Sequence, residues 1–318
     1  MTNRTAVRAV RRVVDPVREF LHAEATGGLV LLAATVVALG WANSPLADAY
    51  QGLWGRELTV GVGRLALTED LKHWVNDGLM AVFFFVVGLE IKRELVAGEL
   101  RDPRRAGLPV LAALGGVVVP AAIFLALNLG DGARGWGIPM ATDIAFAVGV
   151  LAVLGSRVPT GAKLFLLTLA IVDDILAITV IAVFYSDGVV AEWQVVALCG
   201  LAGIFTLQRL GVRAISAYVP LALVVWLATF ESGVHATIAG VALGLATPAL
   251  PFRGRPVLEQ LQRRLHPLSS YVIVPLFALA NAGVPLGADA LGRAAGSPVA
   301  WGDAPMACQV AMAACRSR

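Results

Sequence analysis

The chain consists of long apolar stretches separated by short polar or basic breaks. Nine stretches approach the ~20 residues that an α-helix needs to cross a hydrocarbon core about 30 Å thick. Backbone groups in lipid must be paired within the structure, so each stretch is predicted to be a helix. The predicted spans are Ala23–Ala42, His73–Leu95, Gly107–Leu129, Trp136–Leu154, Lys163–Tyr185, Trp193–Arg209, Ile215–Phe230, Val234–Leu250 and Leu268–Leu286. The pattern therefore predicts an all-α polytopic membrane protein.

Composition supports a single membrane domain. Hydrophobic residues make up 58% of the 318 residues and charged residues only 15%, whereas soluble domains have about 25% charged residues. The net charge of +3 is spread along the chain, so no nucleic-acid partner is expected. The three cysteines have neither the number nor the spacing of a disulfide framework or a metal site. We expect no resident cofactor.

Three regions follow from this pattern. Residues 1–22 form a basic N-terminus whose arginines fit a surface helix or a solvated tail equally well. The apolar run after it is too long for a signal peptide, so we expect a retained first span. Residues 23–287 form the membrane domain, and residues 288–318 form an atypical tail with two of the three cysteines. Within the first long loop, residues 55–70 alternate weakly and indicate a short hairpin.

The basic residues predict the orientation. Eighteen Lys and Arg residues lie in the loops on the side of the N-terminus, and five lie in the loops on the other side. Basic loops remain in the cytoplasm. We therefore expect a multi-pass protein with a cytoplasmic N-terminus.

Carboxylates lie near the middle of two predicted spans. Asp173 and Asp174 are adjacent in the fifth span and, on a helix, point about 100° apart. A charge at the bilayer centre costs roughly 2.5–3.5 kcal/mol on insertion scales, and such residues usually mark an ion or proton path. The alternative is a structural pair satisfied by buried partners.

The fourth span is predicted to be a discontinuous helix. Pro139 and nearby glycines precede Thr142 and Asp143, and proline interrupts the helical hydrogen bonds. Broken helices in transporters provide carbonyls and helix ends for ion binding, although a simple proline kink is the alternative. Carboxylates, a hydroxyl group and carbonyls suit a hard cation such as sodium rather than zinc. Burial and like charge favour a protonated carboxyl group, so one site can hold protons or a cation in turn.

Polar residues also occur at both ends of the second span and before the eighth. Asp77 lies near the predicted outer end, and Glu90 and Glu94 lie near the cytoplasmic end, four residues apart. These acids fit either a solvated helix end with intrahelical pairs or an acidic access path that responds to pH. His235 lies at a span boundary, where a histidine can titrate near neutral pH.

Five motifs give the chain a resemblance to a known family. They are VNDGLMAVFFFVVGLEIKREL, ATDIAFAVGVLAVLG, LAIVDDILAI, SGVHATIAG and PLFALANAGV. In this order, over about residues 15–287, they resemble the NhaA-type bacterial sodium/proton antiporters. The resemblance implies a twelve-helix inverted-repeat fold in the bacterial inner membrane, exchange of one sodium or lithium ion for two protons, and a homodimer.

The resemblance also implies roles for individual residues. Asp173 and Asp174 would be the pair that transiently binds the cation or protons, and Thr142 and Asp143 would lie where two broken helices cross. A second set would line the access paths and respond to pH: Asp77, Glu90, Glu94 and His235.

The chain departs from the family pattern near its end. It supplies about nine spans of twelve, and no lysine follows Lys163 to match the lysine of the family's Gly-Lys-Pro motif. The acidic position four residues before His266 is Gln262. The sequence thus predicts a C-terminally truncated or frameshifted member, active or inactive. An intramembrane aspartyl protease is the other alternative, although MAT precedes Asp143 and IVD precedes Asp174 where such proteases have GxGD.

Overall fold

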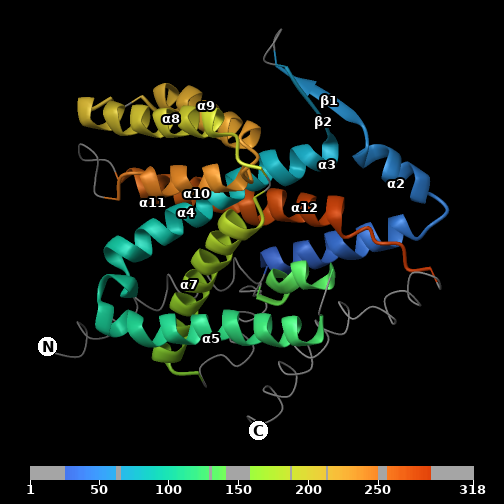
Figure 1. The fold of residues 1–318 in the computed structure, drawn as a ribbon, viewed down its shortest axis with the longest axis horizontal. Helices are drawn as coiled ribbons and strands as arrows, with labels where there is room; N and C mark the ends of the chain where they lie inside the picture. The colour runs from blue at the N-terminus through green and yellow to red at the C-terminus, as the bar shows by residue number, and fades with distance from the viewer. Residues whose placement is uncertain are drawn as a thin grey trace, which may run out of the picture.

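The computed structural model describes residues 26–61, 66–128, 131–140, 158–186, 188–212, 214–249 and 256–287. These residues form a helical bundle with one small hairpin at its side (Figure 1). The basic N-terminus and the tail of residues 288–318 lie outside the described residues.

The first helix, Thr26–Ala42, turns by 116° into α2, Ala47–Trp54. The polar residues Asn43 and Ser44 make the bend, and the Asn43 side chain donates to the Leu39 carbonyl at 2.8 Å. In α2, Tyr50 and Trp54 are buried against Ala38 of the first helix and Ala280 near the end of the chain. This packing fixes α2 across the end of the bundle.

The hairpin predicted within residues 55–70 is confirmed. Strands β1 (Glu57–Val60) and β2 (Leu67–Asp70) pair antiparallel, with Glu57 opposite Asp70. The indole nitrogen of Trp74 donates to the Leu58 carbonyl at 2.9 Å, which ties the hairpin to the following helix.

The second predicted span is one continuous helical rod with an irregular start. It comprises α3 (Leu71–His73), a π-helical turn η2 (Trp74–Leu79) and α4 (Met80–Ala97). Asp70 caps its N-terminus by accepting a hydrogen bond from the His73 amide at 2.7 Å. A π-turn holds one residue more than an α-turn and often marks a functional site.

Two helices and a 3₁₀ segment form the next group. A short turn η3 (Glu99–Arg101) leads to α5 (Pro103–Leu127), and η4 (Asp131–Met140) leads toward the predicted fourth span. Helix α7 (Thr160–Phe184) is the predicted fifth span. The chain is therefore 3₁₀ rather than α-helical where the fourth span was predicted to begin, and the rest of that span lies outside the described residues.

The last group contains α8 (Ala191–Leu210), α9 (Ile215–Glu231) and α10 (Thr237–Ala246), followed by α11 (Val257–Leu268), a second π-turn η6 (Ser269–Ile273) and α12 (Val274–Asn281). Figure 1 shows α8 and α9 side by side at one edge of the bundle, where they pack on each other. Helix α8 ends at Gly211, whose φ of 76° is in the left-handed region.

Helices α4 and α10 make the tightest contact, and glycines line it. A Cβ atom on Gly244 would lie 2.6 Å from the Phe85 carbonyl oxygen, and one on Gly88 would lie 2.7 Å from the Val241 carbonyl oxygen. Gly240 faces the carbonyl of Ala81 still more closely. Small residues four apart let helix backbones approach closely in membranes, and here they hold the second span against the eighth.

The outward faces of the long helices are apolar. In α5, for example, Leu108 and Leu111 are more than 60% exposed. Three described helices are long and apolar enough to cross a membrane, or four if the bent first pair is one span. The other predicted spans are shorter or divided by π-turns. The count of nine spans therefore stays a prediction.

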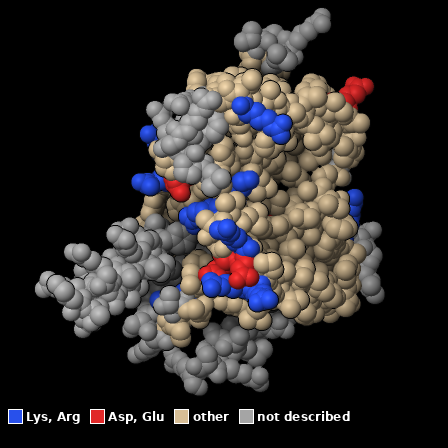
Figure 2. Space-filling model, turned by 90° about the vertical axis from the view of Figure 1, so that its left-hand side faces the viewer, with Lys and Arg blue, Asp and Glu red and all other residues tan. Residues whose placement is uncertain are grey.

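Basic side chains gather on one face of the bundle. Figure 2 shows Lys and Arg concentrated on the face that corresponds to the left-hand side of Figure 1, where α4 ends and α5 begins. Exposed arginines here include Arg101 in η3 and Arg104 and Arg105 in the first turn of α5. Arg105 pairs with Glu99 at 3.4 Å and Asp102 at 3.7 Å.

Candidate ion-translocation site

The two adjacent carboxylates lie inside α7. Asp173 is only 3% exposed and Asp174 is half-buried. Their neighbours along the helix, including Val172, are apolar. A carboxylate placed this deep in an apolar helix needs a protein or ion partner, because an unpaired buried charge is strongly unfavourable.

The structure brings Glu90 of α4 toward this pair. Asp174 interacts electrostatically with both Glu90 and Asp173. Helices α4 and α7 are in contact. Three carboxyl groups from two helices therefore share one region, an arrangement favourable to a cation or to protons.

Glu90 is also held from the other side by a buried glutamine. The Gln262 side chain on α11 donates to the Glu90 carboxylate at 3.3 Å and accepts from the Arg93 guanidinium at 3.1 Å. Gln262 is 8% exposed. It thus joins an acid and a base that are one turn apart on α4, and links α11 to the region of the aspartates. Sequence reasoning noted Gln262 only as a departure from an acidic family position.

Glu94 has a different role from Glu90 in the structure. Its carboxylate folds back over Gly98 and accepts a hydrogen bond from the Glu99 amide at 2.7 Å. It therefore caps η3, the turn that joins the second span to α5. The two acids predicted to share one face thus make different contacts.

Asp77 lies in the π-turn η2 at the other end of the same rod. It interacts electrostatically with Glu69, His73 and His235. The Trp226 indole donates to the Asp77 carbonyl at 2.9 Å. His235 is exposed. The structure thus joins the predicted access residues Asp77 and His235 in one titratable cluster, whereas Glu90 and Glu94 lie near the opposite end of α4.

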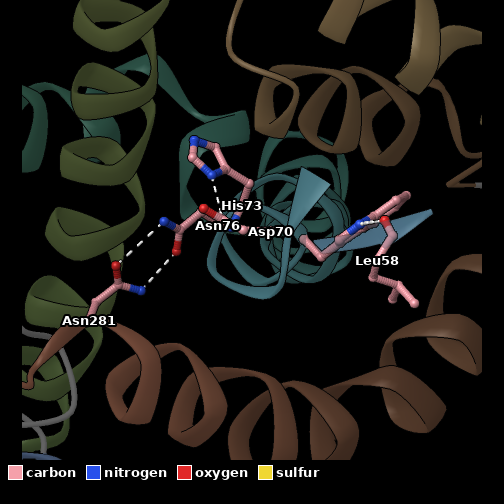
Figure 3. Close-up of polar contacts among 6 residues, drawn as sticks. Leu58, Asp70, His73, Asn76 and Asn281 are labelled. Carbon is pink, nitrogen blue, oxygen red and sulfur yellow. Dashed lines mark hydrogen bonds and ion pairs between the residues drawn. The ribbon is translucent and has the colours of Figure 1, made fainter. Parts of the chain in front are cut away.

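Two carboxamides connect this end of the second span to the ninth. Asn281 donates to the Asn76 side-chain oxygen at 2.8 Å, and Asn76 donates back at 3.4 Å (Figure 3). Asn281 also donates to the Phe277 carbonyl at 2.9 Å. Sequence reasoning missed this pair, although Asn281 lies within the PLFALANAGV motif.

Asp70, which caps the start of the same helix, also contacts the ring of His73. The ring nitrogen Nδ1 of His73 lies 2.8 Å from the Asp70 carboxylate (Figure 3). The His73 amide, which donates to this carboxylate, is the main cause that lowers the pKa of Asp70. Because Asp70 lies in β2, before the rod begins, this group is outside the membrane-spanning part.

Two predicted ion-site residues are not placed. Thr142 and Asp143 fall within residues 141–157, outside the described residues. The segment just before them is described: Met140 at the end of η4 is buried with Val117 and Ala121 of α5, in a cluster against which Leu176 and Val180 of α7 pack. Earlier in η4, the Tyr185 hydroxyl accepts from the Gly137 amide at 2.9 Å and donates to the Arg134 carbonyl at 2.8 Å.

Comparison with known proteins decides the family. Residues 18–305 match the sequence profile of the family described as Na+/H+ antiporter 1. The chain belongs to this family.

Relatives of the Na+/H+ antiporter 1 family match over most of the chain. One named Na(+)/H(+) antiporter NhaA, from Acidovorax sp. (strain JS42), is 53% identical over 92% of this chain and 70% of its own length. Na(+)/H(+) antiporter NhaA 2 from Sorangium cellulosum (strain So ce56) is 48% identical, covering 91% of this chain and 71% of the relative. A third from Shewanella sp. (strain ANA-3) is 50% identical, covering 85% and 70%. The resemblance inferred from the motifs is thereby confirmed.

Membership in the Na+/H+ antiporter 1 family makes this chain a membrane-integral protein of the bacterial transporter type. The helical structure with apolar outer faces fits that assignment. The all-α polytopic fold class predicted from the sequence is confirmed, apart from the added β1–β2 hairpin.

Proposed function

We propose that the chain exchanges sodium or lithium ions for protons across the bacterial inner membrane. The observation that carries the proposal is the pair Asp173 and Asp174 inside α7, with Asp173 almost fully buried. The relatives from Acidovorax and Shewanella are named Na(+)/H(+) antiporters. The transported ions are substrates, and the exchange needs no cofactor.

The mechanism that we propose is competition at these carboxylates. A buried carboxylate pair is stable when it binds either protons or a cation. Glu90 adds negative charge from α4, and Thr142 and Asp143, as implied by the family resemblance, would add a hydroxyl and a third carboxylate. Binding of one substrate excludes the other, so a site exposed to each side in turn exchanges them.

Two packed groups of helices support alternating access. Helix α5 packs on α7 and on η4, whereas α4 packs mainly on α10. The contact between α7 and α4 is much smaller than either of these, and it is where Glu90 meets Asp174. Relative movement of the two groups would open the site while leaving the packing within each group intact.

We propose that the basic face in Figure 2 is cytoplasmic, together with the N-terminus. Basic loops remain on the cytoplasmic side, and this face carries the exposed arginines of η3 and the start of α5. Asp77 then lies on the outer path and Glu94 near the inner one. A cysteine that replaces Arg104 should not be labelled when an impermeant thiol reagent is added from outside. This measurement checks the orientation.

A homodimer is the assembly that we propose. All four residues of β1 are exposed, and the outer edge of an exposed strand is a template for pairing with another chain. Light scattering in detergent should give twice the mass of the chain. A monomer at all concentrations would contradict this.

The decisive experiment measures sodium-driven proton flux in liposomes that contain the purified chain. Asp173→Asn and Asp174→Asn should each abolish the flux, while Asp48→Asn, an exposed acid in α2, should leave it unchanged. Flux that survives in both α7 variants refutes the mechanism. Absence of flux in the wild type favours the inactive fragment instead, and cleavage of a peptide without flux favours the protease.

A further inference from the structure

Tyr185 makes a contact that the proposed exchange mechanism does not yet use. It follows α7 directly, and its hydroxyl lies between two backbone groups of η4. The hydroxyl donates to the Arg134 carbonyl at 2.8 Å and accepts from the Gly137 amide at 2.9 Å. One side chain thus satisfies both a donor and an acceptor of a 3₁₀ segment that lies about fifty residues earlier in the chain. We call this contact the Tyr185 bridge.

The surroundings are shaped for this bridge. A Cβ atom on Gly137 would lie 2.7 Å from the Tyr185 hydroxyl oxygen and about 3 Å from its ring, so a larger residue at this position would force the tyrosine side chain to move. Trp136 packs edge-on against Phe184, with ring centroids 5.2 Å apart, and tilted against Tyr185 at 6.3 Å. A Cβ atom on Gly135 would lie 3.0 Å from the ring of Phe124 in α5.

The bridge works together with a second contact farther along η4. Met140, the last residue of the segment, is 3% exposed and lies in a cluster with Val117 and Ala121 of α5, against which Leu176 and Val180 of α7 pack. Leu176 is two residues from Asp174 in the same helix. The second half of the 3₁₀ segment is therefore held against both α5 and the helix that carries Asp174.

We propose that Tyr185 is a positioning residue for the ion site: its hydroxyl ties the end of α7 to η4 and so holds in place the helix that carries Asp173 and Asp174. The proposal rests on the exchange function proposed above. A site built from separate segments binds its cation tightly only when the segments are held in place beforehand. Loss of the bridge should therefore weaken cation binding more than it slows transport.

The test measures proton flux against sodium concentration for the full chain in liposomes. Tyr185→Phe should raise the apparent KM for sodium about five- to tenfold, the factor that corresponds to losing about one net hydrogen bond. The maximum rate per reconstituted protein should change less than about twofold. A residue with a merely structural role would instead lower the amount of folded protein and leave KM unchanged.

Gly137→Ala provides an independent route to the same loss. The added methyl group displaces the hydroxyl without touching Tyr185 itself, and should raise KM to a similar extent. In the double variant the effects should not add, because both changes break one contact. Additive effects would mean that the two residues act separately and would overturn the proposal.

The matched control is Tyr218→Phe. This change also removes a hydroxyl-to-carbonyl hydrogen bond, from Tyr218 to Val212 at 2.9 Å, but at the start of α9 and away from η4. It should leave KM unchanged. An equal rise in KM for Tyr218→Phe, or no rise for Tyr185→Phe in an active protein, would overturn the positioning role while leaving the exchange function intact.

A second readout separates the bridge from transport itself. Hydrogen–deuterium exchange should become faster across residues 134–140 in Tyr185→Phe and stay at the wild-type rate in Tyr218→Phe. Equal exchange in all three proteins would overturn the bridge. If the wild type shows no flux, the exchange function fails, and this measurement alone decides whether Tyr185 holds η4 on α7.

Discussion

The glycine-lined contact between α4 and α10 makes a sharp prediction for Gly244→Ala. A Cβ atom on Gly244 would lie 2.6 Å from the Phe85 carbonyl oxygen and 2.7 Å from two backbone atoms of Gly88. Ordinary contacts begin at 3.4 Å. All three obstacles are backbone atoms, so no side chain can rotate away. The two helices must separate by about 0.8 Å to accept the methyl group.

The cost follows from the dispersion energy across the interface. A gap of this size forfeits about a quarter to a half of a contact worth about 0.1–0.2 kcal/mol. Over roughly forty atom pairs, this is about 1–4 kcal/mol. Alanine returns about 1 kcal/mol through its higher helix propensity. We therefore expect Gly244→Ala to destabilise the protein by up to about 3 kcal/mol.

Gly116→Ala in α5 is the matched control. A Cβ atom there meets nothing within 4 Å, so only the gain in helix propensity remains, and the variant should be as stable as the wild type or slightly more stable. Thermal unfolding in one detergent, monitored by tryptophan fluorescence, should place the Tm of Gly244→Ala several degrees below that of Gly116→Ala. Equal Tm values would refute the close contact between α4 and α10.

Three further predictions concern polar contacts. Asp70→Ala should lower Tm, and because folding lowers the pKa of Asp70, its stabilising contribution is complete above about pH 4 and lost as pH falls through the folded pKa. Asn281→Ala leaves Asn76 without its partner and should cost about 1–3 kcal/mol, checked by the same unfolding assay. Gln262→Ala releases Glu90 and should alter the pH profile of sodium-driven flux, whereas an unchanged profile would show that this link has no influence on transport.

Much of the helical architecture could be predicted from the sequence because apolar runs in lipid leave the backbone few alternatives. Helix α7 was predicted to within three residues at its start and one at its end. The hairpin within residues 55–70 also followed from alternation between turn residues. These features depend on local pattern, which the sequence displays directly.

The eighth and ninth spans were predicted less well. Helix α10 covers only Thr237–Ala246 of the predicted Val234–Leu250, because Pro248 forces the residue before it into an extended conformation. The helix that leads into the ninth span begins eleven residues before the predicted start of that span: α11, from Val257, is polar on one face and precedes the apolar part. Pro267 lies within this helix.

The contacts at the candidate site could not be read from the sequence. The apolar sequence around Asp173 and Asp174 predicted that these aspartates lie within a helix of the membrane domain. Gln262 and Glu90, however, are 172 residues apart, and no sequence pattern connects them. The spacing of Glu90 and Glu94 predicts that they share one face of the helix. The Glu94 carboxylate instead caps the turn that follows, where it accepts a hydrogen bond from the Glu99 amide. Tyr185 ended a predicted span like any interfacial tyrosine, and only the fold reveals the amide and carbonyl that it bridges.

The π-turn η2 has a consequence for how this rod tolerates changes in length. Each residue rotates a helix by about 100°, so the extra residue in Trp74–Leu79 sets the angular offset between the hairpin side and the α4 side of the rod. Deleting one codon here would convert the turn to regular α-helix. Asp77 would rotate away from Trp226, while α4 would keep its packing against α10. Within α4 itself, the same deletion would rotate Gly88 out of its contact with α10. Natural single-residue gaps among relatives should therefore gather at this turn.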